Sequence, residues 1–114
     1  MTDHPRIAAL KQYALEVLHD AQERFKQVET EFATNRDDPG LLTKLNAVDR
    51  ELDLATDRLP LYVPAFGSEI CPYCFLIRET DYRLRIDHHV RDTAATDDTA
   101  ICLACGFHKP VPRL

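Results

Sequence analysis

All four cysteines of this 114-residue chain fall into two CxxC pairs, Cys71–Cys74 and Cys102–Cys105, separated by 27 residues. Two cysteines in this spacing can bind one ion from a single tight turn, called a zinc knuckle. Zinc takes four such thiolates in a tetrahedron, with Zn–S bonds of about 2.3 Å. The spacing therefore predicts one structural zinc ion per chain, bound by Cys71, Cys74, Cys102 and Cys105.

Three other uses of paired cysteines remain open, and each fits the sequence less well. Disulfides need an oxidising compartment, but the opening MTDHPRIAAL lacks the charged and apolar regions of a signal peptide. A redox centre needs only one CxxC pair. An iron–sulfur cluster also takes four cysteines, but two separated pairs with β-like sequence between them favour zinc. The start of the chain and its use of cysteine predict a cytoplasmic protein.

The two pairs, Cys71-Pro72-Tyr73-Cys74 and Cys102-Leu103-Ala104-Cys105-Gly106, resemble the two knuckles of a zinc ribbon. The resemblance covers about residues 66–112. Zinc-ribbon knuckles commonly end in glycine; the second pair keeps Gly106, whereas the first has Phe75. Zinc ribbons occur in transcription factors, ribosomal proteins, enzyme subunits and adaptors, so the resemblance predicts a scaffold rather than a function.

Residues 1–60 carry the pattern of a helical hairpin. Thr2 or Asp3 can cap the first helix, Pro5 suits its first turn, and no further proline or glycine occurs before Pro39. Apolar side chains recur at helical spacing along one stripe, namely Ile7, Leu10, Ala14, Val17, Leu18, Ala21, Phe25, Val28 and Phe32. This pattern predicts one helix over about residues 4–34.

The second helix is predicted over about residues 39–59. Asp38 is a good cap, Pro39 suits the first helical position, and Pro60 ends the segment. Its apolar residues form a heptad seam made of Leu41, Leu45, Val48, Leu52, Ala55 and Leu59. The seam indicates packing against the first helix, with residues 35–40 as the turn.

The two predicted helices differ in length, and this difference predicts where the chain start lies. About 20 residues rise roughly 30 Å and 31 residues roughly 46 Å, so residues 4–14 should extend past their partner. We expect this overhang to pack against the zinc module or the 61–65 linker. Leu15, Leu42 and Leu54 lie off the main seams, which predicts a homodimer through the helices.

The remaining residues, 66–114, predict a small β zinc module. Residues 75–77 and 82–86 are expected strands around a turn at 79–81, and the polar run 91–99 is an expected loop. Residues 100–101 and 107–109 are expected short strands, with Pro110 and Pro112 ending regular structure. The expected fold class is therefore α+β, with a coiled-coil-like antiparallel hairpin at 1–60, a linker and a C-terminal ribbon.

Asp87-His88-His89 is the one group that points towards catalysis. An acid–His pair between two CxxC motifs resembles the layout of HNH endonucleases, in which the histidine is a general base. His108 is the expected third group beside a second metal ion. The resemblance departs at residues 97–101, which contain no asparagine, and Pro110 and Pro112 leave little room for the HNH helix. A nuclease is the third hypothesis.

The charge pattern argues against general nucleic-acid binding. The formal net charge is −5, with −4 on residues 1–60 and −1 on residues 61–114. Arg78, Arg83 and Arg85 are the candidate contacts for a phosphate backbone or an acidic partner. A nucleic-acid-binding or transcription-associated regulator that uses these arginines is the second hypothesis.

A helical hairpin before a four-cysteine zinc module also resembles, in architecture only, the DksA and TraR group that binds bacterial RNA polymerase. That resemblance implies a functional hairpin tip, where Asp37 and Asp38 lie here. No apolar run is long enough to cross a bilayer. The first hypothesis is a non-enzymatic interaction or adaptor protein that binds a protein partner of unknown identity and one structural zinc ion.

Overall fold

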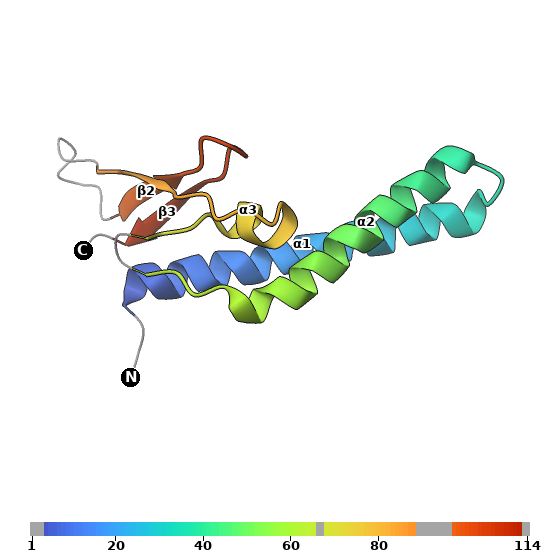
Figure 1. The fold of residues 1–114 in the computed structure, drawn as a ribbon. Coiled ribbons are helices and arrows are strands. Elements are labelled where there is room, and N and C mark those ends of the chain that lie inside the picture. The colour runs from blue at the N-terminus through green and yellow to red at the C-terminus, as the bar shows by residue number, and fades with distance from the viewer. Residues whose placement is uncertain (1–3, 66–67, 89–96, 113–114) are drawn as a thin grey trace.

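The structure is a computed structural model that describes residues 4–65, 68–88 and 97–112. Its elements are the helices α1 (Pro5–Thr34) and α2 (Pro39–Arg58), the 3-10 turn η1 (Leu59–Leu61), the helix α3 (Pro72–Ile77) and the strands β1 (Arg85–Asp87), β2 (Asp97–Ile101) and β3 (His108–Pro112). Figure 1 shows the two long helices as an antiparallel hairpin, with the sheet and α3 at one end and the hairpin tip at the other. The predicted α+β class is confirmed.

Helix α1 begins at Pro5, and the residue that caps it is His4. The His4 Nδ1 accepts a hydrogen bond from the Arg6 backbone N–H at 3.1 Å. Thr2 and Asp3, the caps expected from the sequence, lie outside the described residues. Every residue of the predicted apolar stripe is buried or half-buried. The helix ends at Thr34, so the predicted span is confirmed.

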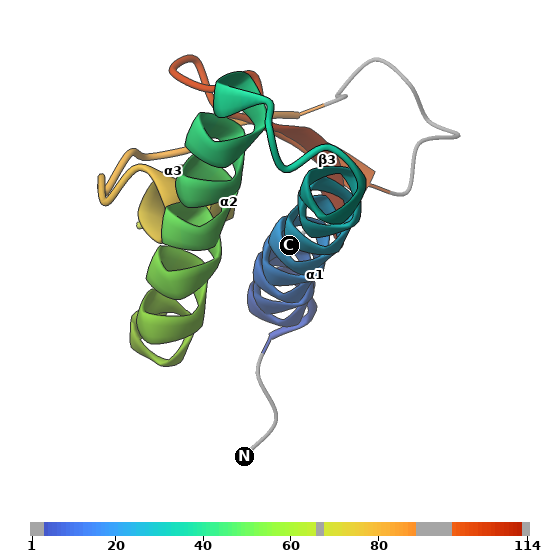
Figure 2. The ribbon, with the colours of Figure 1, turned by 90° about the vertical axis from the view of Figure 1, so that its right-hand side faces the viewer.

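Helix α2 begins as the sequence predicts. Asp38 Oδ1 accepts a hydrogen bond from the Gly40 N–H at 2.9 Å, and Pro39 occupies the first helical position. The helix ends at Arg58 and tightens into η1, which contains Pro60. All six residues of the heptad seam are buried or half-buried. Helix α2 runs alongside α1, and the two are packed together (Figure 2).

The first half of α1 extends past α2 and runs beneath the sheet (Figure 1). The Tyr13 hydroxyl donates to the Pro110 carbonyl at 2.6 Å, and Arg6 Nε donates to the Pro112 carbonyl at 3.1 Å. The overhanging end of the helix thus packs on the C-terminal module, as the unequal helix lengths predict.

The sheet is antiparallel with the strand order β1-β2-β3, which makes β3 an edge strand. The prediction that Pro110 and Pro112 end regular structure is wrong, because β3 continues through both. Proline is tolerated on an edge strand, where the missing N–H would point away from the neighbouring strand. The carbonyls of the same two prolines accept the hydrogen bonds from α1, so the helix covers this edge.

The prediction of a strand over residues 75–77 is also wrong, because these residues belong to α3. Cys71 caps this helix, with its Sγ 3.5 Å from the Cys74 backbone N–H, and Pro72 occupies the first helical position. The C=O of Cys74 accepts from the N–H groups of Arg78 and Thr80, which closes the helix. The expected 82–86 strand is shorter and shifted, since β1 spans Arg85–Asp87.

The expected loop over 91–99 lies largely outside the described residues, and its last three residues belong to β2. The main core lies where α1, α3 and the sheet meet. Its buried residues are Leu10, Ala14, Val17, Ala55, Tyr62, Cys71, Cys74, Leu76, Leu84, Ala100, Cys102 and Val111. The Tyr62 hydroxyl donates to the Ile70 carbonyl at 2.6 Å, so the predicted linker contributes to this core.

Two of the off-seam leucines, Leu15 and Leu42, are 48% exposed, and Leu54 is half-buried. The homodimer through the helices stays a prediction. No helix in the described ranges combines the length and the apolar composition that crossing a bilayer requires.

Candidate metal centre

The first knuckle (residues 71–74) joins a short ladder to the start of α3. The Cys71 N–H donates to the Tyr82 carbonyl at 2.8 Å, and the Leu84 N–H donates to the Glu69 carbonyl at 2.7 Å. These bonds fix Cys71 at the N-cap of α3, and Cys74 follows in the first helical turn. The helix explains why Phe75 stands where zinc ribbons have glycine: residue 75 continues the helix and its N–H donates to the Cys71 carbonyl.

The second knuckle (residues 102–105) is a tight turn between β2 and β3. The Cys102 N–H donates to the Phe107 carbonyl at 2.8 Å, and the Gly106 N–H donates to the Cys102 carbonyl at 3.0 Å. Gly106 has a φ of 81°, in the left-handed region where only glycine is free of strain. The glycine of the sequence motif is therefore required by the turn.

The two knuckles place all four sulfur atoms within 4.8 Å of one another. Cys71 Sγ lies 3.5 Å from Cys105 Sγ, and Cys74 Sγ lies 3.6 Å from Cys102 Sγ. Four sulfurs about 2.3 Å from a tetrahedral ion are about 3.8 Å apart, which matches this cluster. The four cysteines predicted as ligands are thus brought together in position to bind one metal ion.

The electrostatics of the cluster favour a bound cation. Burial raises the pKa of the Cys71 thiol well above its ordinary value, and burial together with the neighbouring sulfurs raises the pKa of Cys74 to about 12. Burial also opposes ionisation of Cys102, but hydrogen bonds from the N–H groups of Cys105 and Ala104 lower its pKa. A divalent ion offsets the repulsion between thiolates, so its binding should release protons.

Three of the cysteines are buried, and Cys105 is half-buried. Four protein ligands complete a tetrahedral shell. An ion bound by all four cysteines would have no position left for a water molecule or a substrate, and it would hold two segments of the chain together.

The acid–His pair lies away from this cluster. His88 Nδ1 is 2.9 Å from Asp98 Oδ2, near the start of β2. His108 lies opposite Ile101 in the sheet, and Ile101 is three residues, or about 10 Å, further along β2 than Asp98. His88 and His108 therefore lie towards opposite ends of the sheet. Asp87 is an exposed residue of β1, and His89 lies outside the described residues. The structure does not bring together the three groups expected of an HNH site.

The three candidate arginines differ in their surroundings. The Arg78 guanidinium donates to the Ala104 carbonyl at 3.2 Å, so it braces the second knuckle against the end of α3. Arg83 donates to the Ser68 hydroxyl at 3.3 Å, and Arg85 is exposed on β1. The three side chains come from the end of α3, an isolated bridge with Ile70 and β1, respectively.

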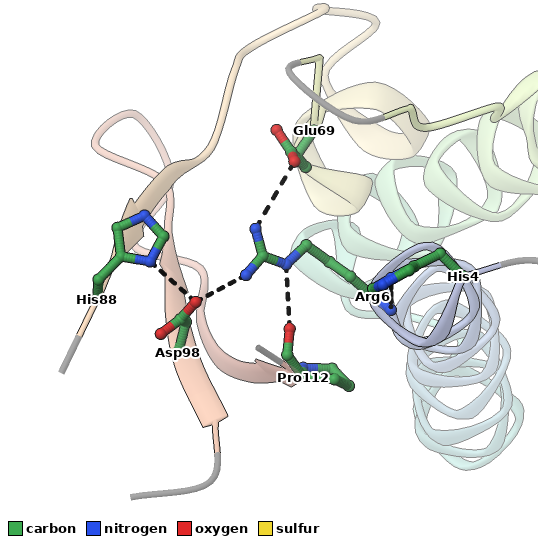
Figure 3. A network of polar contacts seen from close by, with 6 residues as sticks. All are labelled: His4, Arg6, Glu69, His88, Asp98 and Pro112. Carbon is green, nitrogen blue, oxygen red and sulfur yellow. Dashed lines mark hydrogen bonds and ion pairs between the residues drawn. The ribbon is translucent and has the colours of Figure 1, made fainter. Parts of the chain in front are cut away.

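A buried polar network fastens the start of α1 to the sheet (Figure 3), and the sequence reasoning missed it. Arg6 is 2% exposed; its Nη2 lies 2.7 Å from Asp98 Oδ2 and its Nη1 lies 3.9 Å from Glu69. The same Asp98 oxygen lies 2.9 Å from His88 Nδ1 and accepts a hydrogen bond from it when Nδ1 carries the proton. Arg6 lies four residues before Leu10, on the apolar side of α1. A lone arginine among apolar residues on one helix face is the feature of the sequence that could have indicated a buried ion pair.

Comparisons with protein-family models, with curated proteins and with solved structures give no match. The resemblances to zinc ribbons and to the DksA and TraR group therefore gain no support from relatives. A helical hairpin precedes a three-stranded sheet, and four cysteines lie together between α3 and the sheet, at distances that could hold one metal ion.

Proposed function

We propose that this protein is a small cytoplasmic zinc-binding interaction module without enzymatic activity, in which one structural zinc ion holds the C-terminal module together. The observation that carries the proposal is the cluster of four sulfur atoms within 4.8 Å of one another. Zinc is the metal that best suits an all-thiolate tetrahedral site that needs no redox chemistry.

The size of the C-terminal module supports a structural role for the ion. The stretch from the end of η1 to the end of β3 is 51 residues long, and a unit of this size buries too little apolar surface to be more than marginally stable alone. Cys71, Cys74 and Cys102 are also members of the main core. Metal binding there contributes directly to the free energy of folding.

The case against catalysis is the closed ligand shell. Zinc with four thiolates has no vacant position and little residual positive charge with which to polarise a phosphate. A nuclease would need a second ion near His88. Instead, His88 Nδ1 lies beside Asp98 Oδ2, and that oxygen also accepts a hydrogen bond from the buried Arg6. This arrangement supports a positioning role for the pair in the fold.

Metal analysis of the purified protein tests the zinc assignment. We expect one zinc per chain by mass spectrometry under native conditions and by elemental analysis. Replacement of zinc by cobalt should give the absorption bands of tetrahedral thiolate coordination. Zero zinc together with two disulfides, or iron as the bound metal, would overturn the assignment.

A second measurement tests the absence of catalysis. The protein is incubated with plasmid and single-stranded DNA in Mg²⁺ or Mn²⁺, beside the His88→Ala variant. We expect no cleavage by either protein. Cleavage by the wild-type protein that disappears in the variant would replace the proposal with a nuclease.

The same samples distinguish a protein-binding module from a nucleic-acid regulator. Nucleic-acid binding through Arg83 and Arg85 would weaken steeply as salt is raised, because each phosphate contact releases counterions. We expect no such salt-dependent binding at physiological ionic strength, given the net charge of −5.

A further inference from the structure

A pocket of about 240 Å³ opens beside the second knuckle, between the first half of α1 and the chain that leads into β3. Its lining residues are Tyr13, Glu16, Val17, Asp20, Tyr73, Cys105, Gly106, Phe107 and Lys109. Sites for drug-sized ligands usually measure about 300–1,000 Å³, so this pocket is the size of a single large side chain. Cys105, the half-buried cysteine of the metal cluster, forms part of its wall.

The α1 wall of the pocket presents two carboxylates. Tyr13, Glu16, Val17 and Asp20 follow the i, i+3, i+4, i+7 spacing of one helix face. Glu16 and Asp20 are exposed, and neither forms an ion pair within the described part of the chain. Their charges are therefore available to a group that enters the pocket.

The lining of the pocket also includes three aromatic side chains, Tyr13 on α1 and Tyr73 and Phe107 from the C-terminal module. The rings of Tyr13 and Phe107 meet edge to face, with centroids 5.8 Å apart and an angle of 72°. Lys109 Nζ lies 6.0 Å from the Tyr13 ring centroid, and the Arg78 guanidinium lies 5.9 Å from that of Tyr73. Rings of the pocket thus already attract cations of the same chain, although at the outer limit for a cation–π interaction.

The balance of charge around the pocket is negative. Two carboxylates face one ammonium group, Lys109. A divalent ion with four thiolates would have a net charge of −2, and one of those cysteines, Cys105, lines the pocket. The raised pKa of Tyr13, caused by its burial and then by the charges of Glu16 and Asp97, agrees with this negative potential.

We propose that this pocket binds an arginine side chain of a partner protein. This inference rests on the proposed function, an interaction module, and adds the chemistry of the contact. A planar guanidinium can stack on one of the aromatic rings while its N–H groups donate to the carboxylates of Glu16 and Asp20. Arginine suits the site better than lysine, because lysine has a compact ammonium that cannot stack or form a bidentate pair.

The test is a titration of the zinc-loaded, ¹⁵N-labelled full chain with the peptide Ac-Gly-Gly-Arg-Gly-Gly-NH₂, followed by NMR. We expect saturable shifts of the Tyr73, Gly106 and Phe107 amides at millimolar peptide. The same peptide with citrulline in place of arginine keeps the shape and loses the charge, and it should bind at least about fivefold more weakly. The lysine peptide should also bind more weakly than the arginine peptide.

Three variants test which residues make the contact. Two of them should change the affinity for the arginine peptide in opposite directions, and the third should leave it unchanged. Glu16→Gln with Asp20→Asn should weaken binding about fivefold, the upper range for exposed ion pairs. Lys109→Gln removes the competing cation and should strengthen binding. The matched control, Glu29→Gln with Asp49→Asn, removes two exposed acids from the hairpin outside the pocket and should leave binding unchanged.

Three results would overturn the proposal: no shift up to about 10 mM peptide, citrulline or lysine binding as tight as arginine, or equal affinity of the pocket variant and its control. Zinc content is measured separately on every sample. A zinc-loaded protein that ignores the peptide defeats only this inference, whereas a protein without zinc defeats the proposed function whatever the peptide does.

Discussion

The two ends of the helical hairpin differ sharply in how much they bury. The base comprises residues 4–21 of α1 together with residues 52–65, 68–88 and 97–112, and the tip half comprises residues 22–51. In the tip half only Val28 and Val48 are buried apolar residues, whereas all other buried apolar residues described, including three cysteines, belong to the base. One pair of continuous helices therefore spans a densely packed region and a lightly packed one.

Their polar contacts differ in the same direction. In the tip half the ion pairs Arg24–Glu51 and Lys44–Glu31 join side chains that are 36–57% exposed. In the base the Arg6–Asp98 pair is 2–4% exposed and shares its carboxylate with His88. Local stability follows buried contacts, so the base should decide whether the molecule unfolds and the tip half should open more easily. Four predictions test this difference.

The largest effect should come from removing the metal cluster. Cys74→Ser leaves three ligands and should abolish stoichiometric zinc binding. Structural zinc contributes about 10–16 kcal/mol in small peptides, comparable to the whole stability of a domain, so the base should unfold. We expect loss of the cooperative thermal transition and part of the helical circular dichroism.

A chelator added to the wild-type protein should give the same change, and zinc should reverse it. Ser68→Ala, which keeps all four ligands, is the control. An unchanged melting temperature after complete removal of the metal would show that the base does not depend on it.

The second prediction compares the buried and the exposed ion pair. Asp98→Ala leaves Arg6 buried without its close partner and should cost about 3–5 kcal/mol of the free energy of unfolding. Glu51→Ala removes the partner of Arg24 at the surface and should cost about 0.2–1 kcal/mol. Urea titration of both variants measures the difference, and equal losses would contradict the contrast between base and tip.

Much of this fold follows from the pattern of the sequence. Regular apolar spacing, Pro5 and Pro39 as first helical residues and the Asp38 cap predict both long helices to within a residue or two. The unequal lengths also predict that the start of α1 reaches the C-terminal module. These signals are local or follow from chain geometry, and packing does not override them.

The smaller elements were predicted less well, because tertiary contacts decide them. Phe75–Ile77 has strand-like composition, but the cap at Cys71 and the proline at position 72 start a helix instead. Pro110 and Pro112 look like breakers until β3 is known to be an edge strand covered by α1.

For the cysteine cluster, the spacing along the chain was enough to predict which four side chains the structure brings together. The Arg6–Asp98 network joins residues 92 positions apart, and the pocket joins α1 to the second knuckle. Neither could be predicted before the overhang was placed on the sheet.

The third prediction compares two leucines. Leu10 is fully buried under the sheet, and Leu10→Ala should cost about 3 kcal/mol, in the range for large-to-small changes in a core. Leu42, which is 48% exposed in the tip half, loses little burial on the same change, and alanine is the better helix former. Leu42→Ala should therefore change the free energy of unfolding by less than about 0.5 kcal/mol.

A loss at Leu42 as large as that at Leu10 would place Leu42 in an interface, such as the predicted helical dimer, and sedimentation would then detect the dimer.

The smallest effect should arise at the cap of α2. Asp38 Oδ1 accepts a hydrogen bond from the Gly40 N–H at 2.9 Å, and Asp38→Ala should cost about 1 kcal/mol of helix stability. Its neighbour Asp37 makes no such bond, so Asp37→Ala is the matched control. If the tip half opens separately from the base, amide hydrogen exchange should quicken about fivefold in residues 30–46 of the Asp38 variant only, because 1 kcal/mol is roughly that factor in an opening equilibrium. The urea midpoint reports unfolding of the base. It should therefore shift by less than a loss of about 1 kcal/mol would produce in a protein that unfolds as one unit. A midpoint that shifts by the full amount would show that tip and base unfold as one unit, and the contrast between them would then be one of packing without consequence for stability.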